Sequence, residues 1–221
     1  MTPAPMPQGD LEDSTGLVPV VPVSFWLVPA AADERWLQGV VSDLARRHGG
    51  PVFEPHVTLH SARCARTIDI EAILGRLAAQ CPALNLEALA TAESDVYYRT
   101  LFVDIAKDKL DGERMLGLRR QLVRALHDAH RGDAQDAEGA SAAGTGHELQ
   151  QALSSHGFRP HLSLLYGNLA QPQRAALAQQ NDFRERSIVF DRICAVRPAP
   201  GLADMSQVSH WEVFGHRTLS G

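Results

Sequence analysis

The sequence is poor in cysteine, with only three among its 221 residues: Cys64, Cys81 and Cys194. They form no CxxC or other paired pattern, so neither a disulfide framework nor a cysteine-based zinc site is indicated. This usage is typical of a reducing compartment, and we expect a cytoplasmic location.

A long uninterrupted hydrophobic run is also missing. Residues 17–31 are rich in Val, Leu and Ala, but three prolines interrupt them, and the run is shorter than the roughly 20 residues that a membrane span needs. Acidic residues precede the run where a signal peptide would carry positive charge: Asp10, Glu12 and Asp13. We therefore expect a soluble protein with no membrane partner.

Positive charge is not in excess. The chain has 21 Lys and Arg against 26 Asp and Glu, a net charge of -5. This argues against a large basic surface for long nucleic acid and favours a small phosphate ligand in a local positive pocket. We expect residues 1–17 to be a disordered tail, because they are mostly Pro, Gly, Ser, Thr and acids. Residues 18–221 are expected to form one monomeric domain of two packed lobes.

Three common catalytic signatures are absent from the sequence, namely HExxH, GxSxG and GxxxxGK[ST]. His56 and His60 are four residues apart, but they lie in a predicted strand without a carboxylate ligand nearby. We therefore expect no metal site and no cofactor.

What the sequence does contain is a heptad that occurs twice. Residues 53–59 read FEPHVTL, and residues 158–164 read FRPHLSL. Four identities and one Thr/Ser match fall at the same offsets, which indicates the two halves of an internal repeat. Each heptad contributes one histidine and one hydroxyl.

Both heptads are predicted to be strands, because proline favours an extended predecessor and the following residues alternate in polarity. Period two then places His56 with Thr58, and His161 with Ser163, on the face opposite the apolar residues. A lone strand histidine is more often structural, but matched frames and matched hydroxyls favour a shared site. If the halves pack about a pseudo-twofold axis, the histidines face each other across one cavity.

Two histidines and two hydroxyls suit the opening of a cyclic phosphodiester by water. This reaction requires a base for the attacking water and an acid for the leaving oxygen, and the unperturbed pKa of imidazole, about 6.5, makes both forms accessible. Thr58 and Ser163 would contact the non-bridging phosphate oxygens. The scheme needs no metal ion.

The other periodic segments predict strands and helices in mixed order. Strands are expected at residues 20–28, 84–93, 100–106, 187–196 and 207–214, and helices at 32–48, 67–80, 108–130 and 171–181. Thr67 is the expected N-cap of the second helix, and residues 131–150 are expected to form a flexible loop, either a lid or a tolerated insertion. This order favours an α+β fold with antiparallel sheets over a doubly wound parallel sheet.

Two residues outside the heptads are candidates for substrate contacts. Trp26, in the first predicted strand, is either a core aromatic or part of the cleft wall. Arg99, at the turn between two predicted strands, is either a solvated cation or a partner for an anionic substrate. Both interpretations stay open for each residue.

At these residues the chain resembles the 2H phosphoesterase superfamily, whose members carry paired H-x-T/S motifs. The stretches 24–29, 53–58 and 160–166, with Trp211-Glu212, are similar to the cyclic phosphodiesterases of plants and yeast. The resemblance covers about residues 20–215. It implies a two-lobed pseudo-twofold α+β fold, with antiparallel sheets facing a central cleft and helices outside.

The resemblance also implies an activity. That family hydrolyses nucleoside 2',3'-cyclic phosphates to 2'-phosphates, and ADP-ribose 1'',2''-cyclic phosphate to the 1''-phosphate. His56 and His161 would be catalytic, with His161 the base and His56 the acid, while Trp26 and Tyr166 would flank the ligand. The plant enzymes have disulfides of which this chain shows no sign, and the segment 131–150 is a further departure.

Two other functions are compatible with the motifs. The RNA 2'-5' ligase-like group acts on RNA-terminal cyclic phosphates, but its second motif is typically followed by Arg, whereas this chain has Tyr166. A silent nucleotide- or RNA-binding module would not need a proton donor and a proton acceptor together.

Overall fold

The computed structural model describes residues 20–136, 149–150, 153–154, 157–198 and 210–221. Within these ranges the chain alternates strands and helices, as the sequence predicts for an α+β fold. In chain order the elements are β1 (Val20–Pro29), α1 (Ala31–His48), β2 (Val57–Ala65), α2 (Ile70–Ala78), β3 (Leu84–Glu93), the 3-10 turn η1 (Tyr97–Arg99), β4 (Leu101–Ile105), α3 (Leu110–Asp136), β5 (His161–Leu165), α5 (Gln171–Gln180), β6 (Ser187–Pro198) and β7 (Trp211–Thr218).

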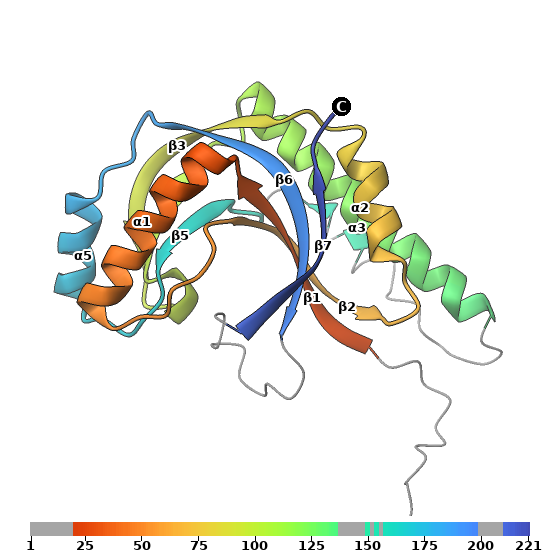
Figure 1. Cartoon of the computed structure of the whole chain (residues 1–221), viewed down its shortest axis with the longest axis horizontal. Coiled ribbons are helices and arrows are strands. Elements are labelled where there is room, and N and C mark those ends of the chain that lie inside the picture. The colour runs from red at the N-terminus through yellow and green to blue at the C-terminus, as the bar shows by residue number, and fades with distance from the viewer. Residues whose placement is uncertain (1–19, 137–148, 151–152, 155–156, 199–209) are drawn as a thin grey trace, which may run out of the picture.

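The strands pair in the order β1-β2-β5-β4-β3-β6-β7, and β6 pairs with β1 as well. Every pairing is antiparallel. The long strand β6 arches across the molecule and serves both halves of the sheet (Figure 1). Its first residues pair with β3, and the rest pair with β1 and β7. The sheet thus has the two expected lobes: β3, β4 and β5 in one, and β1, β2 and β7 in the other.

The lobes meet again where β2 pairs with β5. The register partners there are Val57 and Leu162, and neither side chain is exposed to solvent. Each is the middle residue of an H-x-T/S motif. An antiparallel pair has a local twofold axis, so this pairing relates the two motifs by the expected pseudo-symmetry.

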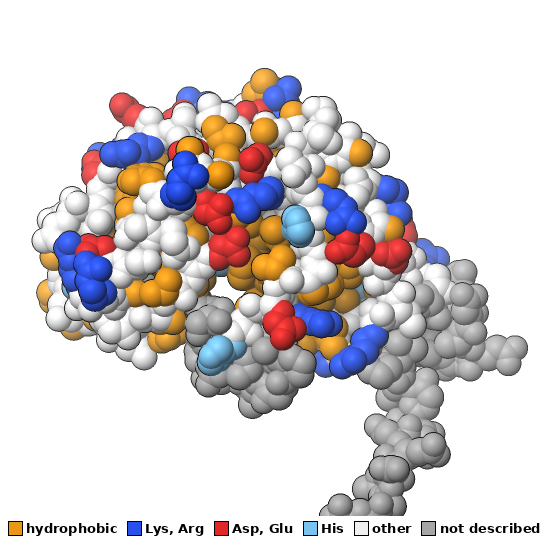
Figure 2. Space-filling model, viewed as in Figure 1, with side chains coloured by type: hydrophobic (Ala, Val, Ile, Leu, Met, Phe, Trp, Pro, Cys, Tyr) orange, Lys and Arg blue, Asp and Glu red, His pale blue; other side chains and the backbone are white. Residues whose placement is uncertain are grey.

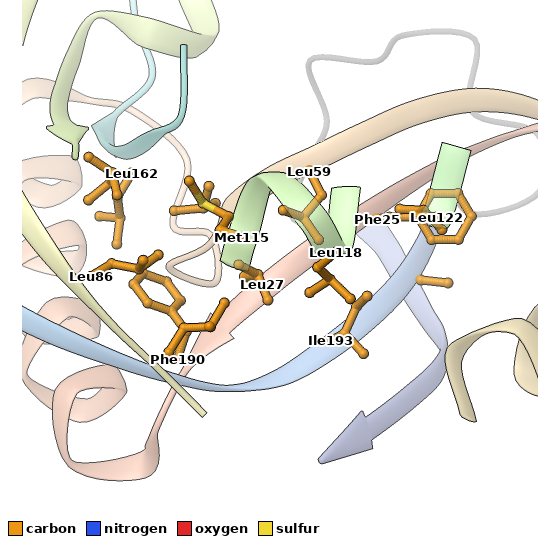
Figure 3. Packing of buried hydrophobic residues seen from close by; sticks show 14 of the residues in the cluster. Phe25, Leu27, Leu59, Leu86, Met115, Leu118, Leu122, Leu162, Phe190 and Ile193 are labelled. Carbon is orange, nitrogen blue, oxygen red and sulfur yellow. The ribbon is translucent and has the colours of Figure 1, made fainter. Parts of the chain in front are cut away.

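The helices cover the sheet in two groups. Helices α1 and α5 lie over the lobe of β3, β4 and β5 (Figure 1). Helices α2 and α3 pack together, with α2 against β6 and β7, and α3 against both β2 and β3. The apolar stripe of α3 enters the core at the helical spacing that the sequence predicts. Figure 3 shows these side chains from the strands and α3 in contact: Phe25, Leu27, Leu59, Met115, Leu118, Leu122, Phe190 and Ile193.

The two histidine strands begin later than the sequence predicts. Strand β2 starts at Val57 instead of residue 53, and β5 starts at His161 instead of residue 158. Pro55 and Pro160 have no N–H to donate, so the hydrogen-bonded ladder forms only after them. Both histidines therefore lie at or just before the first residue of a strand.

Three other predicted boundaries are wrong. Helix α2 is capped by Asp69, which accepts from the Ala72 N–H at 2.9 Å, and not by Thr67. Helix α3 continues to Asp136 through Gly132, which costs a helix only about 1 kcal/mol, so residues 131–136 are not a loop. Strand β7 extends to Thr218 instead of ending at residue 214.

Some expectations concern residues outside the described ranges: the tail 1–17, the segment 137–148 and the predicted strand residues 207–209. All three cysteines are described, and they are free and buried. No helix in the described part of the chain is long and apolar enough to cross a bilayer.

Candidate active site

The pairing that joins the lobes brings the four motif side chains together. Because β2 and β5 are antiparallel, the register places His56 opposite Ser163 and Thr58 opposite His161. All four lie on the face of the ladder away from the buried residues that form the pair. The hydroxyl of each motif is therefore the cross-strand neighbour of the other motif's imidazole.

Both imidazoles make the same backbone hydrogen bond. His56 Nδ1 donates to the Glu54 carbonyl at 2.6 Å, and His161 Nδ1 donates to the Arg159 carbonyl at 3.0 Å. A carbonyl can only accept, so in each neutral ring the proton is on Nδ1 and the lone pair is on Nε2. Each Nε2 can accept a proton as a base or, once protonated, return it as an acid.

His56 lies in an aromatic environment. Its ring stacks on Trp26 with centroids 3.7 Å apart and planes 7° apart, and the Phe53 ring meets it edge-on at 6.5 Å. Burial lowers the pKa of His56 to about 4, the Glu54 carbonyl opposes this, and His161 lowers it further. His56 is therefore neutral at pH 7 in the free protein.

His161 lies among charged groups instead. Its partner across β4 is Asp104, which binds Arg159 through two hydrogen bonds of 2.8 and 2.6 Å. Burial lowers the pKa of His161, as do the charges of Arg99 and Arg159, while the Arg159 carbonyl and the Asp104 carboxylate raise it. The His161 ring also meets Phe102 edge-on at 5.5 Å. The two pseudo-equivalent imidazoles thus differ mainly in the stacked indole beside His56 and the ionised groups beside His161.

The Ser163 hydroxyl is engaged in the free protein. It is buried, and it donates to the Tyr98 carbonyl at 2.9 Å. Contact with a phosphate oxygen would require this hydroxyl to rotate. Thr58, half-buried, lines the cavity described next.

A cavity of about 200 Å³ opens beside His56 and Thr58. Its lining comes from β1, β2, β7, the end of β5 and η1: Ser24, Trp26, His56, Thr58, Ser61, Tyr98, Tyr166 and Trp211. The predicted residues Trp26 and Tyr166 are in this wall, while His161, Ser163 and Arg99 lie beyond it. Sequence reasoning assigned no role to Ser24, Ser61, Tyr98 or Trp211, although Ser24 and Trp211 were part of the resembling stretches.

Trp26 supports His56 and offers little surface to a ligand. Its ring stacks on His56 and also on Trp211, at 5.8 Å and 16°, and it is only 5% exposed. Its Nε1 donates to the Ser24 hydroxyl at 2.9 Å, and that hydroxyl lies 3.0 Å from the Ser61 hydroxyl. The indole is thus fixed on its faces and at its edge, which makes it a platform for the His56 imidazole.

Tyr166 belongs to an aromatic cluster on the other side of the cavity. Its ring stacks on Phe53 at 3.9 Å, and Tyr98 meets it edge-on at 5.7 Å. Gly49 caps the C-terminus of helix α1 with a φ of 77°, a backbone conformation that favours glycine. The next residue, Gly50, approaches the end of β5 closely. A Cβ at Gly50 would collide with the Tyr166 carbonyl, so a glycine there lets the first heptad pack against the second.

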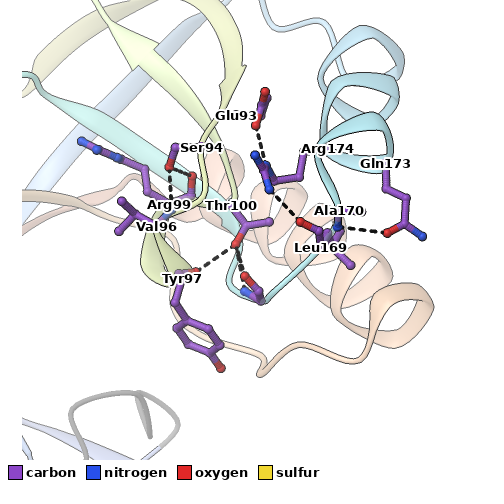
Figure 4. A network of polar contacts seen from close by, with 11 residues as sticks. Glu93, Ser94, Val96, Tyr97, Arg99, Thr100, Leu169, Ala170, Gln173 and Arg174 are labelled. Carbon is purple, nitrogen blue, oxygen red and sulfur yellow. Dashed lines mark hydrogen bonds and ion pairs between the residues drawn. The ribbon is translucent and has the colours of Figure 1, made fainter.

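Arg99 is held close to His161 by the turn η1. The Ser94 hydroxyl donates to the Arg99 carbonyl at 2.8 Å, and Thr100 Oγ1 lies 2.6 Å from the Gly167 carbonyl (Figure 4). The Arg99 guanidinium lies 5.5 Å from the Phe102 ring, and its buried Nε has no partner among the described residues. The turn thus places a cation on the His161 side of the site.

His60 does not share the site with His56. Trp26 pairs with Thr58, whereas Phe25, its neighbour in β1, pairs with His60, so β2 has one extra residue between these pairs, a β-bulge. The bulge places His60 on the same face of the sheet as Phe25, which is buried in the core. Burial, with a smaller contribution from Arg119, lowers the pKa of His60 to about 4. Across the described ranges, no cluster of three or more His, Cys, Asp or Glu side chains could hold a metal ion.

Comparison with protein families gives a match over most of the chain. The model of a family described as cyclic phosphodiesterase-like protein matches residues 21–190, which include both H-x-T/S motifs. No curated protein matches the chain.

Solved structures share the fold at low sequence identity. Escherichia coli LigT in its apo form is 12% identical over 91% of this chain and 99% of its own, with a TM-score of 0.51. TT0787 of Thermus thermophilus is 13% identical over 90% of this chain and 97% of its own, with a TM-score of 0.52. LigT complexed with 3'-AMP is 12% identical, over 92% and 100%, with a TM-score of 0.50. At these identities the similarity concerns the fold.

Proposed function

Because the chain belongs to the cyclic phosphodiesterase-like family of the 2H phosphoesterase superfamily, we propose that it hydrolyses small cyclic phosphodiesters without a metal ion. The proposed substrates are nucleoside 2',3'-cyclic phosphates, opened to 2'-phosphates, and ADP-ribose 1'',2''-cyclic phosphate, opened to the 1''-phosphate. One observation supports the proposal above the others. Each imidazole is fixed through Nδ1, has no hydrogen-bond partner for Nε2 among the residues that the structure describes, and has the opposite motif's hydroxyl beside it.

In this mechanism the two imidazoles act on opposite sides of phosphorus. One Nε2 takes a proton from water as the water oxygen bonds to phosphorus. The protonated Nε2 of the other ring gives its proton to the ribose oxygen as the bond from phosphorus to that oxygen breaks. The two rings exchange protonation states, and solvent restores them after product release.

The remaining groups would bind the phosphate. Thr58 and Ser163 would donate hydrogen bonds to the non-bridging oxygens, where negative charge is concentrated in the transition state. Arg99, held on the His161 side, would add a positive charge nearby. The exposed ring of Tyr98 would contact the ribose or base at the cavity wall. Tyr166, as buried as Trp26, would flank the ligand mainly by supporting Tyr98, while Trp26 would hold the His56 ring.

The size and charge of the site favour a small ligand. A cavity of about 200 Å³ has room for a phosphate and part of a nucleoside. On the face seen in Figure 2, the basic and acidic side chains of the described residues are interspersed, as expected for a protein without a track for long nucleic acid. LigT, which shares the fold, has been crystallised with 3'-AMP, a ligand of the proposed size.

A substrate panel tests the proposal. The purified protein would be assayed with 2',3'-cyclic nucleotides, ADP-ribose 1'',2''-cyclic phosphate and RNA ending in a 2',3'-cyclic phosphate, each with and without EDTA. We expect turnover of the small substrates, unaffected by EDTA, with a 2'-phosphate product from the nucleotides. Turnover of RNA ends alone would favour the RNA 2'-5' ligase-like function, and binding without turnover would favour a silent module. Activity abolished by EDTA and restored by a divalent ion would contradict the metal-independent mechanism.

A further inference from the structure

The cavity beside His56 continues into a second one. The second cavity has a volume of about 310 Å³ and is lined by Pro22, Val23, Ser24, Ser61, Ala62, Arg63 and Trp211. Three of these residues, Ser24, Ser61 and Trp211, line the first cavity as well. The two cavities therefore form one groove, which runs from His56 and Thr58 along β1 and β2 to Arg63.

The register of β1 and β2 places Arg63 on the groove side of the sheet. Ser24 pairs with Ser61, their hydroxyls touch on the groove side, and Pro22 pairs with Arg63 two residues further along. Period two gives Arg63 the same face as Ser61. At about 3.3 Å per residue, the Cα atom of Arg63 lies about 16 Å from that of Thr58, and the long arginine side chain can shorten this distance.

The guanidinium of Arg63 is available for a ligand. The side chain is exposed, and no ion pair of Arg63 is found among the residues that the structure describes. The arginine of β6 at this end of the fold is engaged, since Arg197 pairs with Glu212. His130 Nε2, on α3, lies 3.1 Å from the Arg63 carbonyl. This contact holds the backbone of β2 at Arg63 against α3.

We propose that this groove binds a second phosphate group of the substrate, with Arg63 as its cationic partner. The second phosphate lies beyond the ribose that carries the cyclic phosphate, and Trp211 forms the wall along which the intervening sugar or base runs. The inference rests on the proposed function and specifies its substrate class: cyclic phosphodiesters that extend beyond one nucleoside. A planar guanidinium suits this role because it can bind two phosphate oxygens at once.

A binding experiment tests the subsite independently of turnover. The ligands are adenosine 2'-phosphate and adenosine 2',5'-bisphosphate, measured by calorimetry on the full chain at fixed salt. We expect the bisphosphate to bind the wild-type protein at least about 10-fold more tightly, which is the order of one charge-assisted contact. Arg63→Ala should remove this preference and leave the affinity for adenosine 2'-phosphate within about twofold.

Arg66→Ala is the matched control, because Arg66 is an exposed arginine three residues further along the chain and outside the lining of both cavities. It should keep the wild-type preference. Equal binding of the two ligands by the wild-type protein would overturn the proposal, as would a preference that survives in Arg63→Ala or is lost equally in Arg66→Ala. Thermal melts of both variants would show that they are folded.

Turnover then identifies the source of the second phosphate. The substrates are adenosine 2',3'-cyclic phosphate, ADP-ribose 1'',2''-cyclic phosphate and the dinucleotide ApA with a 2',3'-cyclic phosphate end. A loss of kcat/KM in Arg63→Ala confined to the ADP-ribose substrate assigns the subsite to a pyrophosphate, and a loss confined to ApA assigns it to an RNA end. An equal loss on all three contradicts the subsite. If the wild-type protein turns over none of them, the proposed function fails, and the binding result still decides the phosphate site.

Discussion

Val57 and Leu162 are register partners across the lobes, and both are fully buried at the middle of the repeated motifs. This relationship decides the geometry of the site. With the apolar pair in the core, His56 and Thr58 must face the same side as His161 and Ser163. The packing of two apolar residues thus fixes the positions of two imidazoles.

Replacement of either histidine should abolish most turnover. We expect His56→Ala and His161→Ala each to lower kcat by at least about 10², because each removes a proton transfer. His216→Ala is a suitable control, since His216 is exposed on β7 and outside the lining of the cavity, and it should retain wild-type kcat. Near-normal turnover in either motif variant would make that histidine structural.

The acid and base can be distinguished with a substrate whose leaving group is much better than ribose. Such a substrate needs little acid assistance, so only the variant that lacks the acid is rescued. Burial lowers the pKa of His56 to about 4. Burial and the charge of Arg99 lower the pKa of His161 as well, but the Arg159 carbonyl and the Asp104 carboxylate oppose that shift and favour the protonated ring. We therefore expect rescue of His161→Ala. Rescue of His56→Ala alone would support the opposite assignment, which the resemblance implies.

Trp26 should act through His56. In Trp26→Ala water reaches the imidazole, so the pKa of His56 should rise from about 4 toward 6.5, and kcat should fall. Trp26→Phe keeps a stacking ring and should retain most of both properties. An NMR titration of the His56 ring with steady-state kinetics measures the two effects. An unchanged pKa of His56 in Trp26→Ala would contradict the platform role.

Stability should fall as the pH is lowered from about 6.5 to 4. The pKa values of His56 and His60 are about 4 in the folded protein, below the unfolded value of about 6.5. Over this interval the unfolded chain binds more protons, and each histidine contributes a slope of up to about 1.4 kcal/mol per pH unit. His60→Gln should make the slope shallower. Urea unfolding at several pH values checks this, and an unchanged slope would count against it.

Two glycine substitutions should have opposite effects on stability. In Gly50→Ala the new methyl group meets the Tyr166 carbonyl, and we expect a loss of about 1–3 kcal/mol. In Gly39→Ala, inside α1, no atom beyond the adjacent residues and the surrounding helix backbone lies within 4 Å of the new methyl group, and helix propensity should give a gain of about 0.5–1 kcal/mol. Denaturant unfolding measures both. A neutral Gly50→Ala would show that the contact with Tyr166 is adaptable.

The sequence by itself determined the parts of this protein that depend on local geometry. Proline and period two predicted which motif side chains share a face, and helical spacing predicted the buried stripe of α3 that includes Met115 and Leu122. The repeat predicted the two lobes, because matched offsets in one chain imply matched positions in space. These features require no knowledge of residues far away in the chain.

Only the tertiary structure decided the surroundings of each histidine. Trp26 lies 30 residues before His56, and Asp104 lies 57 residues before His161, so neither neighbour can be read from local periodicity. The bulge that turns His60 away from the site likewise depends on the register between β1 and β2, which the local sequence of β2 does not show. Burial and charge act through space, and for this reason two motifs that are nearly identical in sequence hold imidazoles in different environments.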